Sequence, residues 1–273
     1  MAHRGATAGG PYTPEGVPFI ILDRLCVHRY VGAMAKDAKT SSRKKHVVVL
    51  SGAGLSAESG IPTFRGGDGL WEGHRIEDVA TPEAWARNPR LVLEFYNQRR
   101  KRAMESVPNI GHRIIAELED EFRVTVITQN VDDLHERAGS SDVLHLHGSL
   151  LEARSSTNEN LVYPLSGWEM KWGEVCAEGS PLRPNIVWFN EDVPKIEPAA
   201  RLSAGADAFV VVGTSLAVYP AAGLLDFVRH DVPKIVVDPK IPPVGALLNV
   251  EFIEEVASTG MEKARARLRK LLG

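Results

Sequence analysis

Cysteine is almost absent from this sequence: Cys26 and Cys176 are the only two among 273 residues. Two thiols cannot form a disulfide framework, which indicates a reducing compartment, and they are too few for a four-cysteine zinc site. Long apolar runs are also missing, since none approaches the roughly 20 residues that cross a bilayer. The net charge of -3 gives no strong field to attract nucleic acid or an anionic membrane. We therefore expect a soluble cytoplasmic protein that binds neither nucleic acid nor a membrane.

Short runs of valine and isoleucine recur along the chain and predict strands that are buried on both faces. They lie at residues 46–50, 124–127, 143–146, 186–189, 208–212 and 235–237. Apolar residues three and four positions apart predict helices at residues 89–104, 110–122 and 261–272. Strands that alternate with helices predict an α/β fold with a Rossmann-like, doubly wound parallel sheet.

Three segments depart from this alternation. Residues 1–45 are rich in glycine and proline and end in a polar basic run, so we expect a tail or linker with one short helix near residues 27–36 and no site residue. Within the domain at 46–273, residues 61 to about 102 are helical without a strand and residues 149–183 are irregular, which gives segments of about 61–105 and 149–185 outside the alternation. We interpret these two stretches as insertions that together form a small second lobe.

A glycine-rich turn follows the first predicted strand. Residues 52–57, Gly-Ala-Gly-Leu-Ser-Ala, satisfy the G-x-G-x-x-G/A fingerprint, in which glycines let the backbone approach a pyrophosphate. An ordinary tight turn between strand and helix is the alternative. Residues 59–67 then form a loop, where a dehydrogenase would have a second strand ending in an acidic residue. We expect a bound dinucleotide, held differently from that in a dehydrogenase.

Polar residues also follow two later strands. Residues 128–135 contain Gln129, Asn130 and Asp132 at the end of a strand, where open α/β sheets bind ligands, although an Asx-type helix cap is the alternative. His145 and His147 share one face of the next strand, so both could reach the same cleft. A single histidine is more often structural than catalytic. Its place at the end of a core strand, before a glycine, favours a general base.

In this order, residues 52–65, residues 128–132 and the pair His147-Gly148 resemble the signature motifs of the sirtuin family, with further matches at 187–189 and 213–215. The resemblance covers the chain from about Lys45 to its end. It implies an NAD-dependent protein-lysine deacylase with a Rossmann-like domain and a small lobe made of two insertions. The products would be nicotinamide, free lysine and O-acyl-ADP-ribose.

The resemblance also implies roles for individual residues. His147 would be the general base, since an imidazole with a pKa near 6.5 can activate a ribose hydroxyl at neutral pH. Residues 187–189 (Val187, Trp188 and Phe189) would pair with the backbone of the acyl-lysine peptide or protein substrate. The residues that would contact NAD are Gly52, Ala53, Gly54, Ser56, Phe64, Arg65, Gln129, Asn130, Asp132, Gly213, Thr214, Ser215, Asp238 and Val256.

Tyr96 and Arg99 refine the expected substrate. They lie three residues apart on the predicted helix 89–104, so the hydroxyl and the guanidinium share one face and suit a carboxylate. The alternative is a solvated helix face, because residues 99–102 form a run of cations. Residues 80–100 resemble class III sirtuins, which remove succinyl and malonyl groups and in which a small residue, here Ala80, widens the pocket. Deacetylation would be possible in the same pocket.

The chain departs from the family at the zinc site. Most sirtuins hold zinc with four cysteines, whereas residues 148–183 contain only Cys176. We therefore predict no metal, and a small lobe held by apolar residues such as Leu161, Tyr163, Trp168 and Trp172. Two alternative functions follow from this departure and from the family's chemistry: a non-catalytic NAD or ADP-ribose-binding module, and a protein mono-ADP-ribosyltransferase. We expect a monomer.

Overall fold

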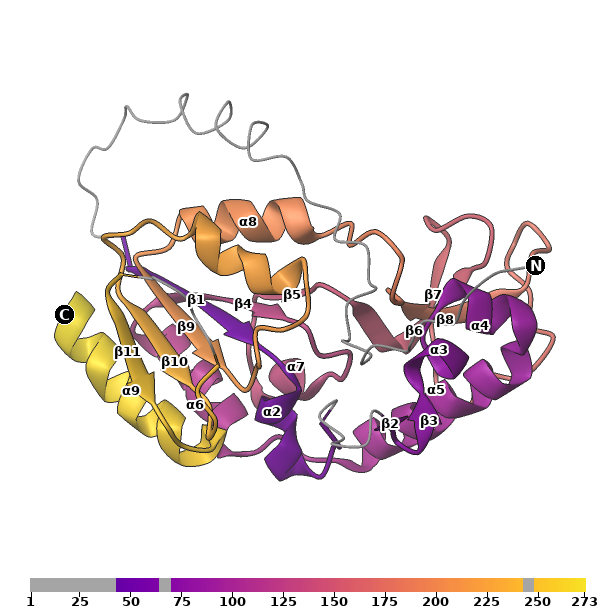
Figure 1. Cartoon of the computed structure of the whole chain (residues 1–273), viewed down its shortest axis with the longest axis horizontal. Helices are drawn as coiled ribbons and strands as arrows, with labels where there is room; N and C mark the ends of the chain where they lie inside the picture. The colour runs from indigo at the N-terminus through magenta and orange to yellow at the C-terminus, as the bar shows by residue number, and fades with distance from the viewer. Residues whose placement is uncertain (1–42, 64–69, 243–247) are drawn as a thin grey trace, which may run out of the picture. The chain divides into compact units, whose positions relative to one another are not determined.

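A six-stranded parallel sheet is the centre of the computed structural model (Figure 1). The structure describes residues 43–63, 70–242 and 248–273, and residues Lys44–Gly273 form one compact unit. Across the sheet the strands are β11 (Val250–Ile253), β10 (Lys234–Val237), β9 (Ala208–Val212), β1 (His46–Ser51), β4 (Arg123–Thr128) and β5 (Val143–His145). Every neighbouring pair is parallel, which confirms the predicted Rossmann-like sheet.

Strand β1 shows why the Val-rich runs form this sheet. All six of its residues are buried, with Val47 and Val49 in the core cluster on one face and Val48 and Leu50 in the cluster on the other. The chain runs from β1 to β4 and β5 on one side, and then returns to β9 on the other side of β1. The order reverses between β1 and β9, and open α/β sheets bind ligands outside the carboxyl ends of such strands.

Helices cover both faces of the sheet. Buried residues of α6 and α9 pack in the same cluster as Val47, while α8 and η4 pack in the cluster of Val48. The helices are α2 (Ala53–Ser56), η2 (Ala57–Ser59), α3 (Ile76–Val79), α4 (Pro82–Arg87), α5 (Pro89–Glu105), α6 (Ile110–Glu117), η3 (Leu118–Asp120), α7 (Leu134–Ala138), α8 (Ile196–Ala204), η4 (Ala221–Phe227) and α9 (Ala257–Leu272). None of these helices, all within the described residues, is long and apolar enough to cross a membrane.

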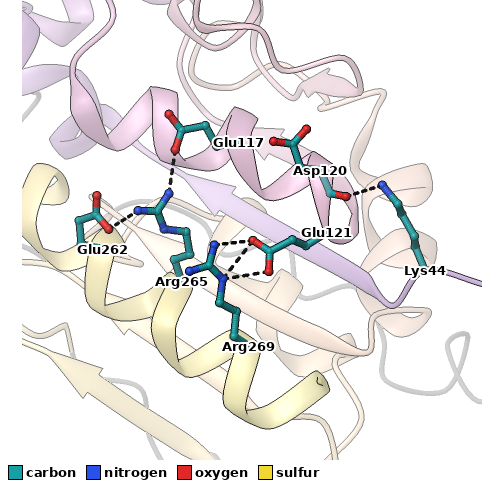
Figure 2. A network of polar contacts seen from close by, with 7 residues as sticks. All are labelled: Lys44, Glu117, Asp120, Glu121, Glu262, Arg265 and Arg269. Atoms are coloured by element: carbon teal, nitrogen blue, oxygen red, sulfur yellow. Dashed lines mark hydrogen bonds and ion pairs between the residues drawn. The ribbon is translucent and has the colours of Figure 1, made fainter.

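Ion pairs join the C-terminal helix α9 to α6 and the turn after it (Figure 2). Arg269 makes a bidentate contact with Glu121, and Arg265 bridges Glu117 on α6 and Glu262 on its own helix. Lys44 donates to the backbone oxygen of Asp120 at the end of η3. These side chains are largely exposed, so they contribute modestly to stability beside the buried contacts of α6 and α9.

Two small antiparallel sheets and three helices form the smaller lobe. One sheet pairs β2 (Leu70–Trp71) with β3 (His74–Arg75); the other has the order β7 (Val162–Pro164), β6 (Gly148–Ser155) and β8 (Leu182–Ile186). The prediction that residues 61–102 contain no strand is therefore wrong, as is the prediction that residues 149–183 are irregular. β6 and β8 pair across residues 156–181, which periodicity does not reveal, whereas β2 and β3 are joined by the tight turn at Glu72 and Gly73.

One further predicted strand is misplaced, and one strand of the sheet was missed. The run at 186–189 is not a strand of the central sheet, because Val187 donates its N–H to the oxygen of His147 and Phe189 donates to the oxygen of Ala80. Its backbone is thus held at the small lobe. The edge strand β11 was not predicted, since its sequence, Val-Glu-Phe-Ile, has only a half-buried pattern. The predicted tail helix near residues 27–36 lies outside the described residues.

The core of the small lobe also differs from the prediction. Trp168 and Trp172 are exposed, and each ring is covered by a cation, Lys101 and Arg90 respectively. Between them Met170 is buried, because the Asn97 side chain bonds both its N–H and its carbonyl oxygen. Leu161 and Tyr163 are half-buried. The residues that fill the lobe instead are Val79, Ala80, Val92, Leu93, Phe95, Tyr96, Leu150, Ala153, Met170, Ile186 and Trp188.

Cys176 lies in a turn that hydrogen bonds join to the end of β6. The Thr157 hydroxyl donates to Ser180 at 2.7 Å, and Ser156 donates to the oxygen of Pro181 at 2.8 Å. The Ser155 hydroxyl holds the pKa of the Cys176 thiol below its usual value. Among the described residues, no three His, Cys, Asp or Glu side chains are grouped as a metal site would require. Hydrogen bonds thus link residues 156–157, which follow β6, to residues 180–181, which follow Cys176.

Candidate active site

The glycine-rich turn after β1 packs directly against the turn after β9. The N–H of Gly54 donates to the oxygen of Gly213 at 2.8 Å, and Gly52 donates to the oxygen of Val212. A Cβ atom on Gly54 would lie 2.8 Å from the Cα of Gly213, and one on Gly52 would lie 2.7 Å from the Cβ of Thr214. Gly213 itself has a φ of 63°, which favours glycine. The two turns therefore form a backbone-lined cradle at the point where the strand order reverses.

The polar residues after β4 face this cradle. Gln129 donates from its amide to the Thr214 hydroxyl at 3.0 Å, which links the ends of β4 and β9. Asn130 donates to the oxygen of Gly52 and to the hydroxyl of Ser56, both at 3.1 Å. The Ser56 hydroxyl donates in turn to Asp132. Burial raises the pKa of the Asp132 carboxyl, although its hydrogen bonds from Leu134 and Ser56 oppose this. The structure thus brings the two predicted motifs together.

His147 lies beside Gln129, and its two ring nitrogens differ. Nδ1 is 3.0 Å from the oxygen of Gln129, and since a carbonyl can only accept, Nδ1 carries the proton. Nε2 makes no hydrogen bond within the part of the chain that the structure describes. Burial lowers the pKa of His147. The ring is therefore neutral at pH 7 with a lone pair on Nε2, as a general base requires.

A buried series of hydrogen bonds connects α7 to the turn after β4 through two hydroxyl groups. His135 donates from Nε2 to Ser51, Ser51 donates to Thr128, and Thr128 accepts the N–H of Asn130. His112 stacks edge-on against His135 with 5.2 Å between ring centroids. Burial lowers the pKa of both histidines, that of His112 to about 4. Both rings are therefore neutral at pH 7.

The remaining predicted NAD-binding residues lie along the same edge of the sheet. Ala53 opens α2 next to Gly52, and Ser215 follows Thr214. Asp238, after β10, is buried and accepts the N–H of Lys240, while Val256, before α9, is exposed. Phe64 and Arg65 lie outside the described residues.

Tyr96 and Arg99 lie side by side within the small lobe. Tyr96 is fully buried, and the Arg99 side chain is 9% exposed. The Arg99 guanidinium lies 5.7 Å from the Tyr96 ring and 4.0 Å from the ring of Trp71. Ala80 is buried in the same cluster. Helical spacing predicted that Tyr96 and Arg99 share a face, and the structure shows that this face points into the lobe.

Four polar atoms around this pair are buried without a hydrogen bond to any described residue. They are the Tyr96 hydroxyl oxygen, the Nε and Nη1 of Arg99 and the indole nitrogen of Trp188. Burial raises the pKa of Tyr96 to about 12, so its hydroxyl keeps its proton. The Nε of Arg99 faces the carboxylate of Glu72 at 3.4 Å, which is an ion pair without hydrogen-bond geometry. All of these groups can donate, and Glu72 approaches only the Nε of Arg99, so the Tyr96 hydroxyl, Arg99 Nη1 and the Trp188 indole have no hydrogen-bond acceptor among the described residues.

The segment 187–189 links the surroundings of Tyr96 to His147, because Trp188 packs in the same cluster as Tyr96 and Val187 donates to the oxygen of His147. The Arg183 guanidinium lies 3.4 Å from the Trp188 ring centroid, and Glu191 accepts both from Arg183 and from the N–H of Trp188. All three backbone N–H groups of this segment donate within the chain. Its pairing with a substrate peptide stays a prediction, and it would have to use groups other than these N–H donors.

Two residues near the site were not anticipated from sequence. Glu72, in the turn between β2 and β3, contacts both Arg99 and Arg102. Glu136, on α7, lies 2.7 Å from His145. Glu72 precedes Gly73, and both have positive φ, so the Trp-Glu-Gly sequence was a detectable hairpin signal. No local pattern marked Glu136.

Known proteins with this arrangement are numerous. The model of the Sir2 family matches residues 52–220. A relative from Helicobacter pylori, named NAD-dependent protein deacylase, is 50% identical over 226 residues, which are 82% of this chain and 97% of that protein. One from Bacteroides thetaiotaomicron with the same name is 50% identical over 229 residues, or 82% of this chain and 98% of that one.

Solved structures agree. A Sir2 homologue in complex with NAD aligns with a TM-score of 0.75 at 39% identity, covering 84% of this chain and 91% of that one. A complex described as Sir2, p53 peptide and NAD+ aligns with a TM-score of 0.66 at 29% identity, covering 83% and 93%. The sequence motifs, the strand order and these relatives lead to one conclusion: this chain belongs to the Sir2 family, the sirtuins.

Proposed function

We propose that this sirtuin removes succinyl and malonyl groups from protein lysines in preference to acetyl groups. NAD-dependent protein deacylation is the activity by which its relatives at 50% identity are named. The preference for an acyl group that ends in a carboxylate is the finer step, and the structure of the small lobe supports it.

The single observation that carries this proposal is the set of unpaired donors in the pocket. Leaving a buried donor without a partner costs about 1–3 kcal/mol, so the Tyr96 hydroxyl and Arg99 Nη1 favour a ligand that accepts from both. A carboxylate does so, because its two oxygens match a guanidinium edge and a neighbouring hydroxyl. An acetyl group ends in a methyl and would leave both donors unpaired. Ala80 contributes only a methyl group to the same cluster, so it takes up little of the space that the longer acyl group would need.

The residues of the cradle fit NAD. The glycines at 52, 54 and 213 let the turns after β1 and β9 pack directly against each other, and a glycine-rich turn that opens a helix at this edge of a parallel sheet is where a pyrophosphate binds. Gln129, Asn130 and Asp132 would hold the nicotinamide end, and Asp238 and Val256 would hold the adenosine end. When bound, NAD supplies an electrophilic ribose carbon and the hydroxyls that take up the acyl group.

His147 then moves the proton. Its Nδ1–H stays bonded to the oxygen of Gln129, which fixes the tautomer and the direction of the ring. Nε2 would take a proton from a ribose hydroxyl of bound NAD, and His147 would be an imidazolium only during this step. The Tyr96 and Arg99 donors hold the far end of the acyl group, so the acyl carbonyl is positioned without a contact to His147.

Steady-state kinetics on one peptide carrying acetyl-, malonyl- or succinyl-lysine test the proposal. Arg99→Met removes a charged partner worth about 2–3 kcal/mol, so kcat/KM for the succinyl peptide should fall about 30- to 150-fold. Deacetylation should change by less than about threefold, since acetyl makes no charged contact. Lys101→Met is the matched control, because Lys101 lies on the same helix and is exposed. Equal losses for both acyl groups would contradict the carboxylate pocket.

The same assay separates the other functions of this family's chemistry. If the wild type releases no nicotinamide with any acyl peptide although calorimetry shows NAD binding, the protein is a binding module. If labelled ADP-ribose stays on protein and no free lysine forms, it is an ADP-ribosyltransferase. Release of nicotinamide together with free lysine, lost in His147→Ala, is the outcome expected of a deacylase.

A further inference from the structure

Two histidines, His145 and His147, lie two residues apart and have opposite surroundings. His147 donates from Nδ1 to the oxygen of Gln129 and leaves Nε2 without a described partner. His145 has a partner at each nitrogen: Nδ1 is 3.1 Å from the oxygen of Asn130, and Nε2 is 2.7 Å from a carboxylate oxygen of Glu136. The function assigned above uses only His147.

The partners of His145 determine its protonation. A carbonyl oxygen and a carboxylate oxygen can only accept, so both ring nitrogens must donate, and only the imidazolium does this. Burial alone would lower the pKa of His145, but the bond and charge of Glu136, the Asn130 carbonyl and the Asp132 charge together raise it above its ordinary value. His147 has no such anion, and burial lowers its pKa.

The titratable groups that face His145 come from α7 and from the turn after β4. Glu136 and the neutral His135 lie on α7, Asp132 lies in the turn, and the neutral His147 follows two residues after the end of β5. The ring therefore joins α7 to the oxygen of Asn130. Asn130 is the residue whose amide contacts Gly52 and Ser56 in the cradle.

We propose that His145 is a positioning residue that acts as an imidazolium, clamping the Asn130 turn against α7, while His147 two residues later is the neutral base. Deacylation then declines at acid pH as His147 gains a proton and declines at alkaline pH as His145 loses one. The proposal rests on NAD-dependent deacylation but not on the acyl preference.

NMR titration of the ring protons of both histidines, in the protein without NAD, tests the charge states directly. We expect the midpoint of His145 above that of His147. Glu136→Gln keeps an acceptor but removes the charge, so it should move the His145 midpoint to lower pH. Asp133→Asn is the matched control. Asp133 precedes the first residue of α7 and its carboxylate pairs with Arg137, so this variant removes a nearby charge and should leave the His145 midpoint in place.

The pH profile of kcat/KM for NAD gives the second readout. In Glu136→Gln the alkaline limb should move to lower pH together with the NMR midpoint. In His145→Gln that limb should disappear, and KM for NAD should rise about tenfold, because one charge-assisted hydrogen bond to the turn is lost. A His145 midpoint at or below that of His147, or an alkaline limb unchanged in Glu136→Gln, would overturn the proposal. Glu136 is 43% exposed, so its variant decides the matter even if His145→Gln does not fold. Because NMR needs no turnover, an inactive enzyme would refute the deacylase function without affecting this test.

Discussion

The buried histidine pair beneath the active site should make this protein unstable in acid. His112 on α6 is fully buried, and burial lowers its pKa from 6.5 to about 4. In the unfolded chain the ring takes up a proton near pH 6.5, whereas in the folded protein it does so only near pH 4. Stability is therefore at its full value above pH 6.5 and declines as the pH falls through this window.

The size of the effect follows from the same two values. The interval from 6.5 to about 4 corresponds to a loss of about 3 kcal/mol, of which about 2 kcal/mol is lost by pH 5. His135, whose pKa burial also lowers, acts in the same direction. Since domains of this kind are stable by only about 5–15 kcal/mol, the loss is readily measured.

Urea unfolding followed by circular dichroism at pH 8 and pH 5 provides the assay. His112→Phe keeps an aromatic ring against His135 but cannot titrate, so its stability should fall less between the two pH values, by about 2 kcal/mol. His230 is exposed, so His230→Phe should keep the pH dependence of the wild type. The reasoning is refuted if His112→Phe and the wild type lose the same stability on acidification.

Two further changes probe the cradle and the C-terminal helix. Gly54→Ala places a Cβ 2.8 Å from the Cα of Gly213 and forces the two turns apart, so NAD binding measured by calorimetry should be lost; retained affinity would show that the close approach is dispensable. Arg269→Gln removes the exposed bidentate contact with Glu121, so the melting temperature should fall by no more than about 3 °C at low ionic strength. A difference that persists in about 1 M salt would contradict an electrostatic origin.

The parts of this fold that were predictable from sequence are those specified by local chemistry. The buried Val-rich runs define β1, β4, β9 and β10, since a strand covered on both faces needs apolar side chains throughout, whereas β5 is half-buried at the edge of the sheet. Glycines at 52 and 54 mark the turn because only glycine tolerates a second backbone so close.

The parts that were not predictable depend on partners far away in the chain. The run at 186–189 has the composition of a buried strand, but the oxygens of His147 and Ala80 take up its N–H groups. Trp168 and Trp172 are large apolar residues of the kind that fill a core, yet they are exposed. Met170 between them is buried instead, because Asn97, 73 residues earlier, bonds its backbone. In each case the local pattern allows two structures, and a long-range hydrogen bond selects one.

The four cations at residues 99–102 show the same limit at the site itself. As a run they suggest a solvated helix face, yet successive residues on a helix point about 100° apart and so cannot share one environment. Arg99 turns toward Tyr96 inside the small lobe, and Arg100 is buried and donates to the oxygens of Leu150 and Trp168. Lys101 covers the ring of Trp168 from outside, and Arg102 pairs with Glu72 at the surface. The proposed acyl preference uses Arg99 and none of the other three cations, and what separates Arg99 from them is the buried, unpaired Tyr96 hydroxyl one turn earlier. A charge run is therefore informative about ligands only when the helix face of each member is considered separately.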